Sequence, residues 1–204
     1  MTTVEAEVGR RRGQKFLQRR CELADAALHT LSELGYARTS LREIAQNSAF
    51  SHGVLHYYFA DKVELITFCV RRYKTTCVQR YDGVVGSAGT SDELADGFAD
   101  ALVATLRAEA SMHRLWYDLR SQALFEDSFR ADVLQIDATL EQMIWRVVSR
   151  YAELTGVPPG VSSAMSYAMF DGLFQQALLQ HLAGNPEAGP QLRERARDLL
   201  PRLL

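Results

Sequence analysis

Apolar residues recur at intervals of three and four along most of the chain, which is the pattern of helices that bury one face. In residues 14–34 the recurring apolar positions are Leu17, Cys21, Ala24, Leu28 and Leu31. Gly35 then offers the left-handed residue that commonly ends a helix. No stretch of the sequence alternates apolar and polar residues as a half-buried strand does. The pattern therefore predicts an all-α protein.

Two short helices are expected next. Ser40 and Glu43 have the spacing of a capping box, in which each side chain accepts from the other's backbone N–H. A helix should therefore run from this box to about Asn47, and Ser51 should start a second one that ends near Tyr58. A longer helix followed by two short helices with about three residues between them has helix-turn-helix geometry.

The rest of the chain predicts a larger helical unit. Asp61 should cap a long helix to about Val84, and Gly83, Gly86 and Gly89 mark a linker. Further helices are expected at about 92–109, 112–125, 128–155, 160–183 and 190–203. The predicted domains are a flexible basic arm (1–13), a helix-turn-helix domain (14–62) and a helical effector-binding and dimerisation domain (63–204).

Charge is distributed unevenly along the chain. Residues 1–80 contain 13 Lys and Arg against 8 Asp and Glu, a net charge of +5, whereas residues 81–204 contain 10 against 17, a net charge of −7. A basic first part on an acidic body favours a polyanionic partner for the first part alone. The run Arg10-Arg11-Arg12 lies in the arm, where contact with DNA and a plain solvated tail are both open.

The cysteines and the lack of long apolar runs indicate where in the cell the protein is located. Cys21, Cys69 and Cys77 form no C-x-x-C pair, and an odd count fits a reducing compartment. Residues 1–20 lack the apolar run of a secretory signal, and no uncharged apolar stretch reaches 18 residues. We therefore expect a soluble cytoplasmic protein with no membrane partner.

The second short helix has the outward side chains of a helix that reads DNA. Its expected outward residues are Ser51, His52, Gly53, His56 and Tyr57. Such side chains supply donors and acceptors for base edges and phosphates. A helix of this size also fits the major groove, which is about 12 Å wide.

Three runs in the first 65 residues or so carry a resemblance to a known family. They are Gly35-Tyr36-Ala37-Arg38-Thr39-Ser40, Glu43-Ile44-Ala45 and Tyr58-Phe59-Ala60-Asp61-Lys62. Their sequence and spacing resemble the DNA-binding region of the TetR family of transcriptional regulators. The resemblance implies a dimeric repressor that binds a palindromic operator in double-stranded DNA and is released by a small-molecule effector.

The resemblance also implies which residues contact DNA. They are Thr39, Ser40, Ser51, His52, Gly53, Val54, His56, Tyr57, Tyr58 and Lys62. Thr39 and Ser40 would meet a phosphate at a helix N-terminus, and Lys62 would meet another. Tyr58 would reach a phosphate or brace the fold. The chain departs from the family pattern at Ala49, Phe50 and His56, where Gly, Val and Tyr are frequent.

The carboxyl-terminal part carries no catalytic motif, so we expect neither enzymatic activity nor a cofactor. Glu109 and His113 lie four residues apart without a second such pair, which does not indicate a metal site. An aromatic and Met-rich interior fits a plain core, while the resemblance implies an effector cavity. The candidate ligand-binding residues are Met112, Trp116, Tyr117, Arg120, Tyr167, Phe170 and Phe174.

Residues 162–183 are apolar on nearly all sides, and a helix of this kind is buried on all sides. With the last helix it would form a four-helix bundle across a two-fold axis. We expect a homodimer through the last two helices, with Phe174 and Leu178 in the interface. Asp171 interrupts the apolar run and fits either a satisfied structural residue or a contact for a cationic ligand.

Two other classes of function deserve comparison. An all-helical enzyme needs a reactive constellation, and the sequence contains none. A helical adaptor needs neither a capped, polar recognition helix nor a basic segment before it. The sequence therefore favours a DNA-binding regulator over both.

Overall fold

The computed structural model describes residues 3–204, with side chains for residues 11–36, 38–128 and 130–204. The α-helices are α1 (Thr3–Arg38), α2 (Leu41–Gln46), α3 (His52–Tyr58), α4 (Lys62–Ser87), α5 (Ser91–Gln122), α6 (Arg130–Thr155), α7 (Ser163–Leu182) and α8 (Ala188–Leu199). Short 3-10 helices, η1 (Asp127–Phe129) and η2 (Leu200–Leu203), precede α6 and follow α8. Residues 3–204 contain no strand, and the predicted all-α class is confirmed.

Local sequence signals place α2, α3 and α4 as expected. The capping box at the start of α2 is formed: Ser40 Oγ accepts from Glu43 N, and Glu43 Oε2 accepts from Ser40 N at 2.7 Å. Ser51 Oγ caps α3, and Asp61 Oδ1 caps α4 at 2.8 Å from Glu64 N. Each bond satisfies a donor that the helix itself leaves without a partner.

Three predicted boundaries differ from the structure. The arm prediction for residues 1–13 is wrong for residues 3–13, which continue α1, because its Glu, Ala and Arg are good helix formers; residues 1–2 lie outside the described chain. Gly83 and Gly86 belong to α4, because Val84 and Val85 pack against the core and outweigh the low helix propensity of glycine. The expected break near residue 111 is instead a bend within α5, where Glu109 has φ −133° and ψ 23°.

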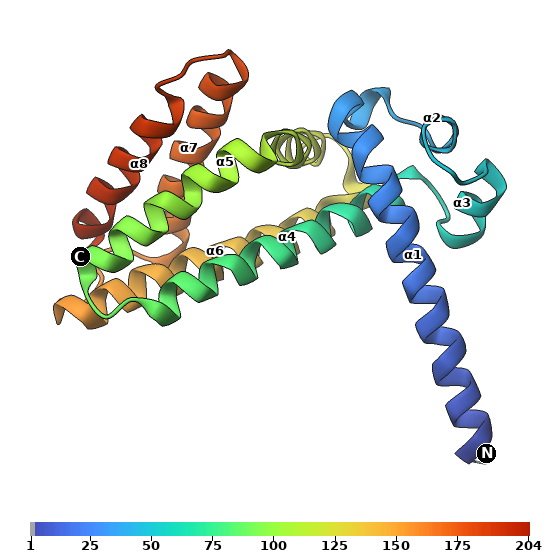
Figure 1. Ribbon diagram of the computed structural model, residues 1–204, viewed down its shortest axis with the longest axis horizontal. Coiled ribbons are helices and arrows are strands. Elements are labelled where there is room, and N and C mark those ends of the chain that lie inside the picture. The colour runs from blue at the N-terminus through green and yellow to red at the C-terminus, as the bar shows by residue number, and fades with distance from the viewer. Residues whose placement is uncertain (1–2) are drawn as a thin grey trace.

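The helices form a body with a smaller helical unit at one end (Figure 1). α2 and α3 pack beside α1, and α4 leads from them into the body. Within the body α4 and α6 lie side by side, while α5 packs against α7 and α8. α1 extends as a long rod away from this assembly toward the amino terminus. The arrangement separates the two short helices from the body's interior.

Hydrogen bonds between α1 and α5 join the two units. Gly35 has φ +76°, a conformation that favours glycine. A Cβ there would also lie 2.9 Å from Asp118 Oδ2 and would displace that carboxylate. The next backbone N–H, that of Tyr36, donates to Asp118 Oδ2 at 2.7 Å, and Tyr36 Oη donates to Glu126 at 3.0 Å. Arg114 Nη2 also donates to the carbonyls of Ser32 and Glu33. The end of α1 is therefore held by side chains of α5 and by Glu126, which follows that helix.

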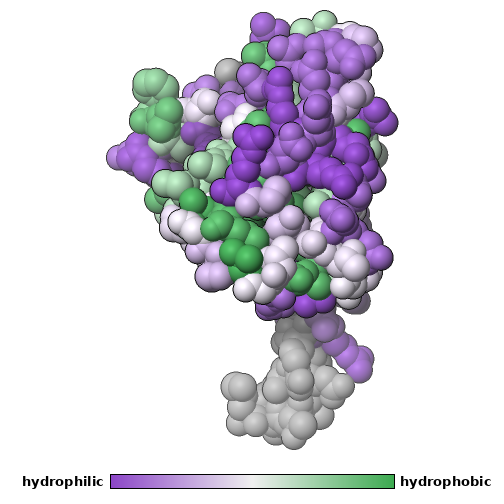
Figure 2. All heavy atoms as spheres, turned by 90° about the vertical axis from the view of Figure 1, so that its left-hand side faces the viewer, coloured by the Kyte–Doolittle hydropathy of each residue, from purple (hydrophilic) through white to green (hydrophobic). Residues whose placement is uncertain are grey.

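α7 has one face in the core and another that is exposed. Phe174 and Leu178 are buried in the chain's own core, at 6% and 3% exposure, so their prediction as interface residues is wrong. The exposed apolar side chains of this helix are Met165, Met169, Leu179 and Leu182. At the end of the body where the chain terminates, hydrophobic side chains gather in patches between hydrophilic ones (Figure 2).

Within the described residues, every helix is too short or too polar to cross a bilayer.

Candidate DNA-binding surface and ligand pocket

α3 is anchored by one side and leaves the other to solvent. On its inner face Leu55 is fully buried, whereas His52, His56 and Tyr57 are exposed, Tyr57 at 73%. The rings of His52 and His56 lie 4.4 Å apart between centroids, one turn from each other on the same face. The helix thus presents polar side chains outward on a packed base, as groove insertion requires.

A shallow groove runs between α2, α3 and the start of α4. Its basic and imidazole side chains are Arg38, Arg42, His52, His56 and Lys62. Sequence reasoning did not include Arg38 and Arg42 among the DNA contacts, because single arginines on a predicted helix also fit a solvated surface. Their convergence on one groove depends on how α2 packs against α3.

Three of the candidate phosphate ligands are engaged within the chain. Thr39 is 2% exposed, and its hydroxyl donates to Gly35 O at 2.7 Å. The backbone N–H of Ser40 donates to the carboxylate of Glu43, which already occupies that part of the helix N-terminus. Lys62 Nζ donates to Tyr36 O at 3.0 Å and lies 4.0 Å above the Tyr36 ring. Thr39 is therefore turned away from solvent, and Lys62 braces the junction with the body.

Aromatic contacts fix the end of α3 against α1. The Phe16 ring lies 4.8 Å from that of Tyr58 and 6.3 Å from that of Tyr57. Tyr58 is half-buried, so its ring serves the brace that the sequence also allowed. Arg20 packs over Phe59 at 4.5 Å. These contacts hold the exposed face of α3 in one orientation relative to α1.

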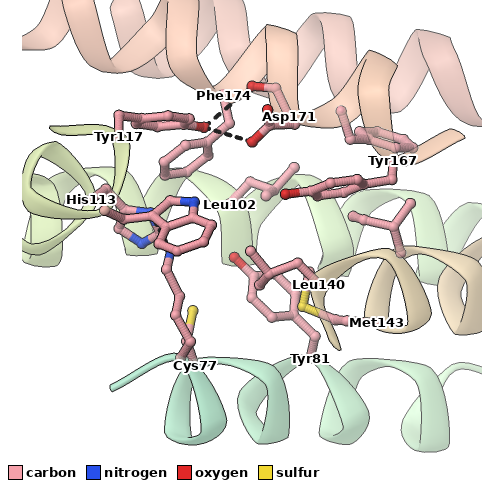
Figure 3. Close-up of a pocket in the computed structure, with 14 residues that line it drawn as sticks. Cys77, Tyr81, Leu102, His113, Tyr117, Leu140, Met143, Tyr167, Asp171 and Phe174 are labelled. Atoms are coloured by element: carbon pink, nitrogen blue, oxygen red, sulfur yellow. Dashed lines mark hydrogen bonds between the residues drawn. The ribbon is translucent and has the colours of Figure 1, made fainter. Parts of the chain in front are cut away.

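A cavity of about 60 Å³ lies inside the body between α4, α5, α6 and α7 (Figure 3). Five of the seven candidate ligand residues line it: Trp116, Tyr117, Tyr167, Phe170 and Phe174. Met112 does not line it, and Arg120 lies behind the wall as a partner of Asp171. The other lining residues are Lys74, Cys77, Tyr81, Leu102, His113, Leu140, Met143, Ile144 and Asp171.

The α4 side of the cavity was not predicted from the sequence. Lys74, Cys77 and Tyr81 recur at intervals of three and four, so they share one face of α4. That spacing was available in the sequence, but a lysine in such a row is normally exposed. Lys74 is instead 3% exposed.

One end of the cavity holds nitrogen donors. Lys74 Nζ lies 3.2 Å from His113 Nδ1 and 5.3 Å from the Trp116 ring. Burial lowers the pKa of Lys74 to about 8. The pKa of His113 lies well below its usual range. Burial is the largest cause, and the positive charges of Lys74 and Arg80 lower the pKa further. At neutral pH the pair is therefore an ammonium beside a neutral imidazole.

At the wall formed by α7, two carboxylates are paired with the chain's own donors. Asp171 accepts from Tyr117 Oη at 2.9 Å and from Arg120 Nη1 at 2.5 Å. Asp137 accepts from Tyr167 Oη at 2.5 Å and lies 3.2 Å from Arg120 Nε. The interpretation of Asp171 as a satisfied structural residue is thereby confirmed.

The amino-terminal part of the chain matches a described family. Residues 23–67 match the model of bacterial regulatory proteins, tetR family. This part of the chain therefore resembles the DNA-binding region of the TetR family. Over 53 residues it is 40% identical to the HTH-type transcriptional regulator BetI of Paraburkholderia phytofirmans, a segment covering 26% of this chain and 27% of that protein. The chain thus matches about a quarter of the length of this curated relative.

Solved structures extend the likeness to the whole fold. A TetR transcription regulator from Haloarcula marismortui superposes with a TM-score of 0.73 over 92% of this chain and 98% of its own, at 19% identity. The regulator FadR from Bacillus subtilis, solved with stearoyl-CoA, gives 0.69 over 88% and 96%, at 15% identity. At these identities the likeness is one of fold.

Proposed function

We propose that the protein is a one-component transcriptional repressor in the cytoplasm that binds a palindromic operator as a dimer and releases it when a small molecule binds. The observation that carries the proposal is the exposed polar face of α3, set on a packed base in the segment that matches the TetR family. His52, His56 and Tyr57 would read base edges, with Ser51, Gly53 and Val54 at the helix start near the backbone. Arg38 and Arg42 would position the helix on phosphates.

Dimerisation through α7 and α8 is part of the same proposal. The exposed Met165, Met169, Leu179 and Leu182 supply the apolar area that a subunit interface needs. Ala168 and Gly172 are exposed on the same helix, and such small residues let two helices approach closely. A two-fold dimer would present two copies of α3 to two half-sites.

The junction between α1 and α5 offers a route from effector to operator. Beyond its bend, α5 directs His113 and Trp116 into the cavity, while Arg114 and Asp118 hold the end of α1. A ligand that displaces this part of α5 would move the support of the DNA-binding unit. α4 offers a second route, because it joins that unit directly to the cavity wall. Effector and operator must then weaken each other's binding by the same factor.

The test begins with fluorescence anisotropy titrations of genomic DNA fragments with the purified protein. A thermal-shift screen then identifies compounds that stabilise the protein, and the titrations are repeated with each of these effector candidates. The proposal predicts tight binding to a subset of fragments that weakens as salt rises. It also predicts that at least one stabilising compound lowers operator affinity. Uniform binding to all fragments, or stabilising compounds that all leave operator affinity unchanged, would contradict it.

A further inference from the structure

The donor end of the cavity contains more hydrogen-bond donors than the protein uses. Lys74 carries three N–H donors and no acceptor, and Figure 3 shows its neighbour His113 at the edge of the cavity. Because the ammonium can only donate, His113 Nδ1 is the acceptor of their 3.2 Å contact. The neutral ring then carries its own proton on Nε2, which makes that nitrogen a donor as well.

Two of these buried donors have no partner among the described residues. They are His113 Nε2 and Trp116 Nε1, on side chains that are 6% and 1% exposed. A buried polar group left without a hydrogen bond is unfavourable, so such groups in native proteins normally meet a ligand or water. The Lys74 ammonium and Trp116 Nε1 together form a site that lacks an acceptor with negative charge. His113 Nε2 points away from Lys74, which is bound to the other nitrogen of the ring, and needs a separate partner such as water.

The cavity itself does not supply that acceptor. Asp171 is paired with Tyr117 and Arg120 at the α7 wall. Glu109 accepts from Arg80 at 2.6 Å and from Tyr73. Both carboxylates therefore have partners of their own, and the unpaired donors face the interior.

A metal ion is the other occupant to consider. Ligand atoms of Cys77, Glu109 and His113 lie within 4.8 Å of one another. The ammonium of Lys74 at 3.2 Å from the imidazole and the guanidinium of Arg80 on Glu109 put two positive charges beside that position. Like charges repel strongly in a buried site. The electrostatics therefore favour an anion over a cation.

We propose that the cavity binds a small carboxylate with an apolar chain, whose head group accepts hydrogen bonds from Lys74 and Trp116 Nε1. The chain would lie toward Leu140 and Met143, which Figure 3 places across the cavity from His113. One ammonium matches the single charge of a carboxylate, whereas a phosphate would bring a second charge without a partner. This inference rests on the proposed function, because the carboxylate would be the effector or share its chemistry.

Cavity size sets the starting range of chain lengths. A volume of about 60 Å³ corresponds to a few water-sized groups, so a carboxylate of about four carbons fits with little movement. Longer chains require the lining to adapt, and the flexible, polarisable side chain of Met143 is suited to that. Butanoate, hexanoate and octanoate, each with the alcohol of the same length, are therefore the probes.

Affinity for the carboxylates should fall as the pH rises above about 8, because Lys74 then loses its proton. The charged or titratable groups that act on Lys74 are Cys77 on its own helix, Glu109 and His113 on α5, Asp137 on α6 and Asp171 on α7. The pKa values of Glu109 and His113 are lowered and that of Cys77 is raised. Each of these three pKa values therefore lies further from pH 8 than the ordinary value of its group. A change in affinity near pH 8 is then due to the titration of Lys74.

Isothermal titration calorimetry of the full chain at pH 7 and pH 9 tests the proposal. At least one carboxylate should bind at pH 7 at least tenfold more tightly than its alcohol, and the preference should shrink at pH 9. Lys74→Met should abolish the preference, and Trp116→Phe should weaken carboxylate binding about tenfold, the value of a hydrogen bond to a charged group. Arg71→Met, which removes an exposed charge from the same helix outside the cavity, should leave both unchanged.

Equal binding of acid and alcohol, a preference that survives Lys74→Met, or no binding by any carboxylate would overturn the inference. Trp116→Phe keeps the test decisive if Lys74→Met does not fold. Parallel operator titrations separate this inference from the proposed function. An alcohol that binds the cavity and releases DNA would keep the effector role and refute the carboxylate, whereas a bound carboxylate that leaves operator affinity unchanged would do the reverse.

Discussion

Replacing Lys74 by Met should make the stability of the protein less dependent on pH in the alkaline range. Burial lowers the pKa of this lysine from 10.5 to about 8 in the folded protein. Since the folded-state pKa lies below the unfolded one, the stability is greatest above pH 10.5 and is lost as the pH falls through 8. At about 1.4 kcal/mol per pKa unit, the full change is on the order of 3 kcal/mol.

The variant also loses a hydrogen bond, because His113 Nδ1 no longer has its donor at 3.2 Å. An acceptor left unpaired in the interior costs about 1–3 kcal/mol. At pH 7 this loss and the relief of the buried charge nearly offset each other, so the absolute stability decides little. The difference between the two proteins as a function of pH is decisive, because the loss of the hydrogen bond does not titrate.

Urea unfolding of both proteins at several pH values from 7 to 9.5 measures that difference. The wild type should gain stability relative to Lys74→Met from about pH 8 upward, with a slope approaching 1.4 kcal/mol per pH unit. Titration of Cys69 and Tyr81, whose pKa values are raised by burial, largely cancels between the two proteins. Parallel stability curves would refute the argument that burial lowers the pKa of the Lys74 ammonium.

Three further substitutions test the rest of the account. Asp118→Ala should destabilise the protein by about 1.5–3 kcal/mol in urea unfolding, because Tyr36 N loses a charged acceptor at 2.7 Å. In this variant the effector should also release less DNA. An Asp118→Asn variant that behaves like Asp118→Ala would contradict the role of the acceptor. Leu179→Glu should give monomers in sedimentation, whereas Leu124→Glu, at a similar exposure of 76% against 71% but off α7, should stay dimeric. His52→Ala should change the base preference of selected DNA, worth about 1–3 kcal/mol of discrimination, while Arg42→Ala should weaken binding to all sequences alike and lower the salt slope by about one; unchanged selected sequences for His52→Ala would rule out a base contact.

Local signals explain why the amino-terminal helices were predictable. Ser40, Ser51 and Asp61 each satisfy a backbone N–H three residues away, so their effect is written in a short stretch of sequence. Gly35 ends the regular part of α1 with a positive φ, as its position predicted. These features need no knowledge of the tertiary fold.

Long-range contacts explain what the sequence did not reveal. Lys62 looks like a free phosphate ligand in the sequence, yet its ammonium is bonded to the carbonyl of Tyr36, 26 residues away. Lys74 looks like a surface lysine, but it is 3% exposed and its ammonium lies against His113 and Trp116 of α5. Phe174 looks like an interface residue because α7 is apolar nearly all round, and only the packing of α5 against α7 shows which face is inside. In each case the partner lies on another helix.

Selection of DNA by the purified wild-type protein from a pool of random duplexes tests the central claim most directly. The account predicts enrichment of one two-fold symmetric sequence, whose half-sites lie about one helical turn, roughly 34–36 Å, apart or further by whole turns. Binding to it should fall linearly with salt on logarithmic axes. Failure to enrich any common sequence, or enrichment of one without two-fold symmetry, would contradict the account.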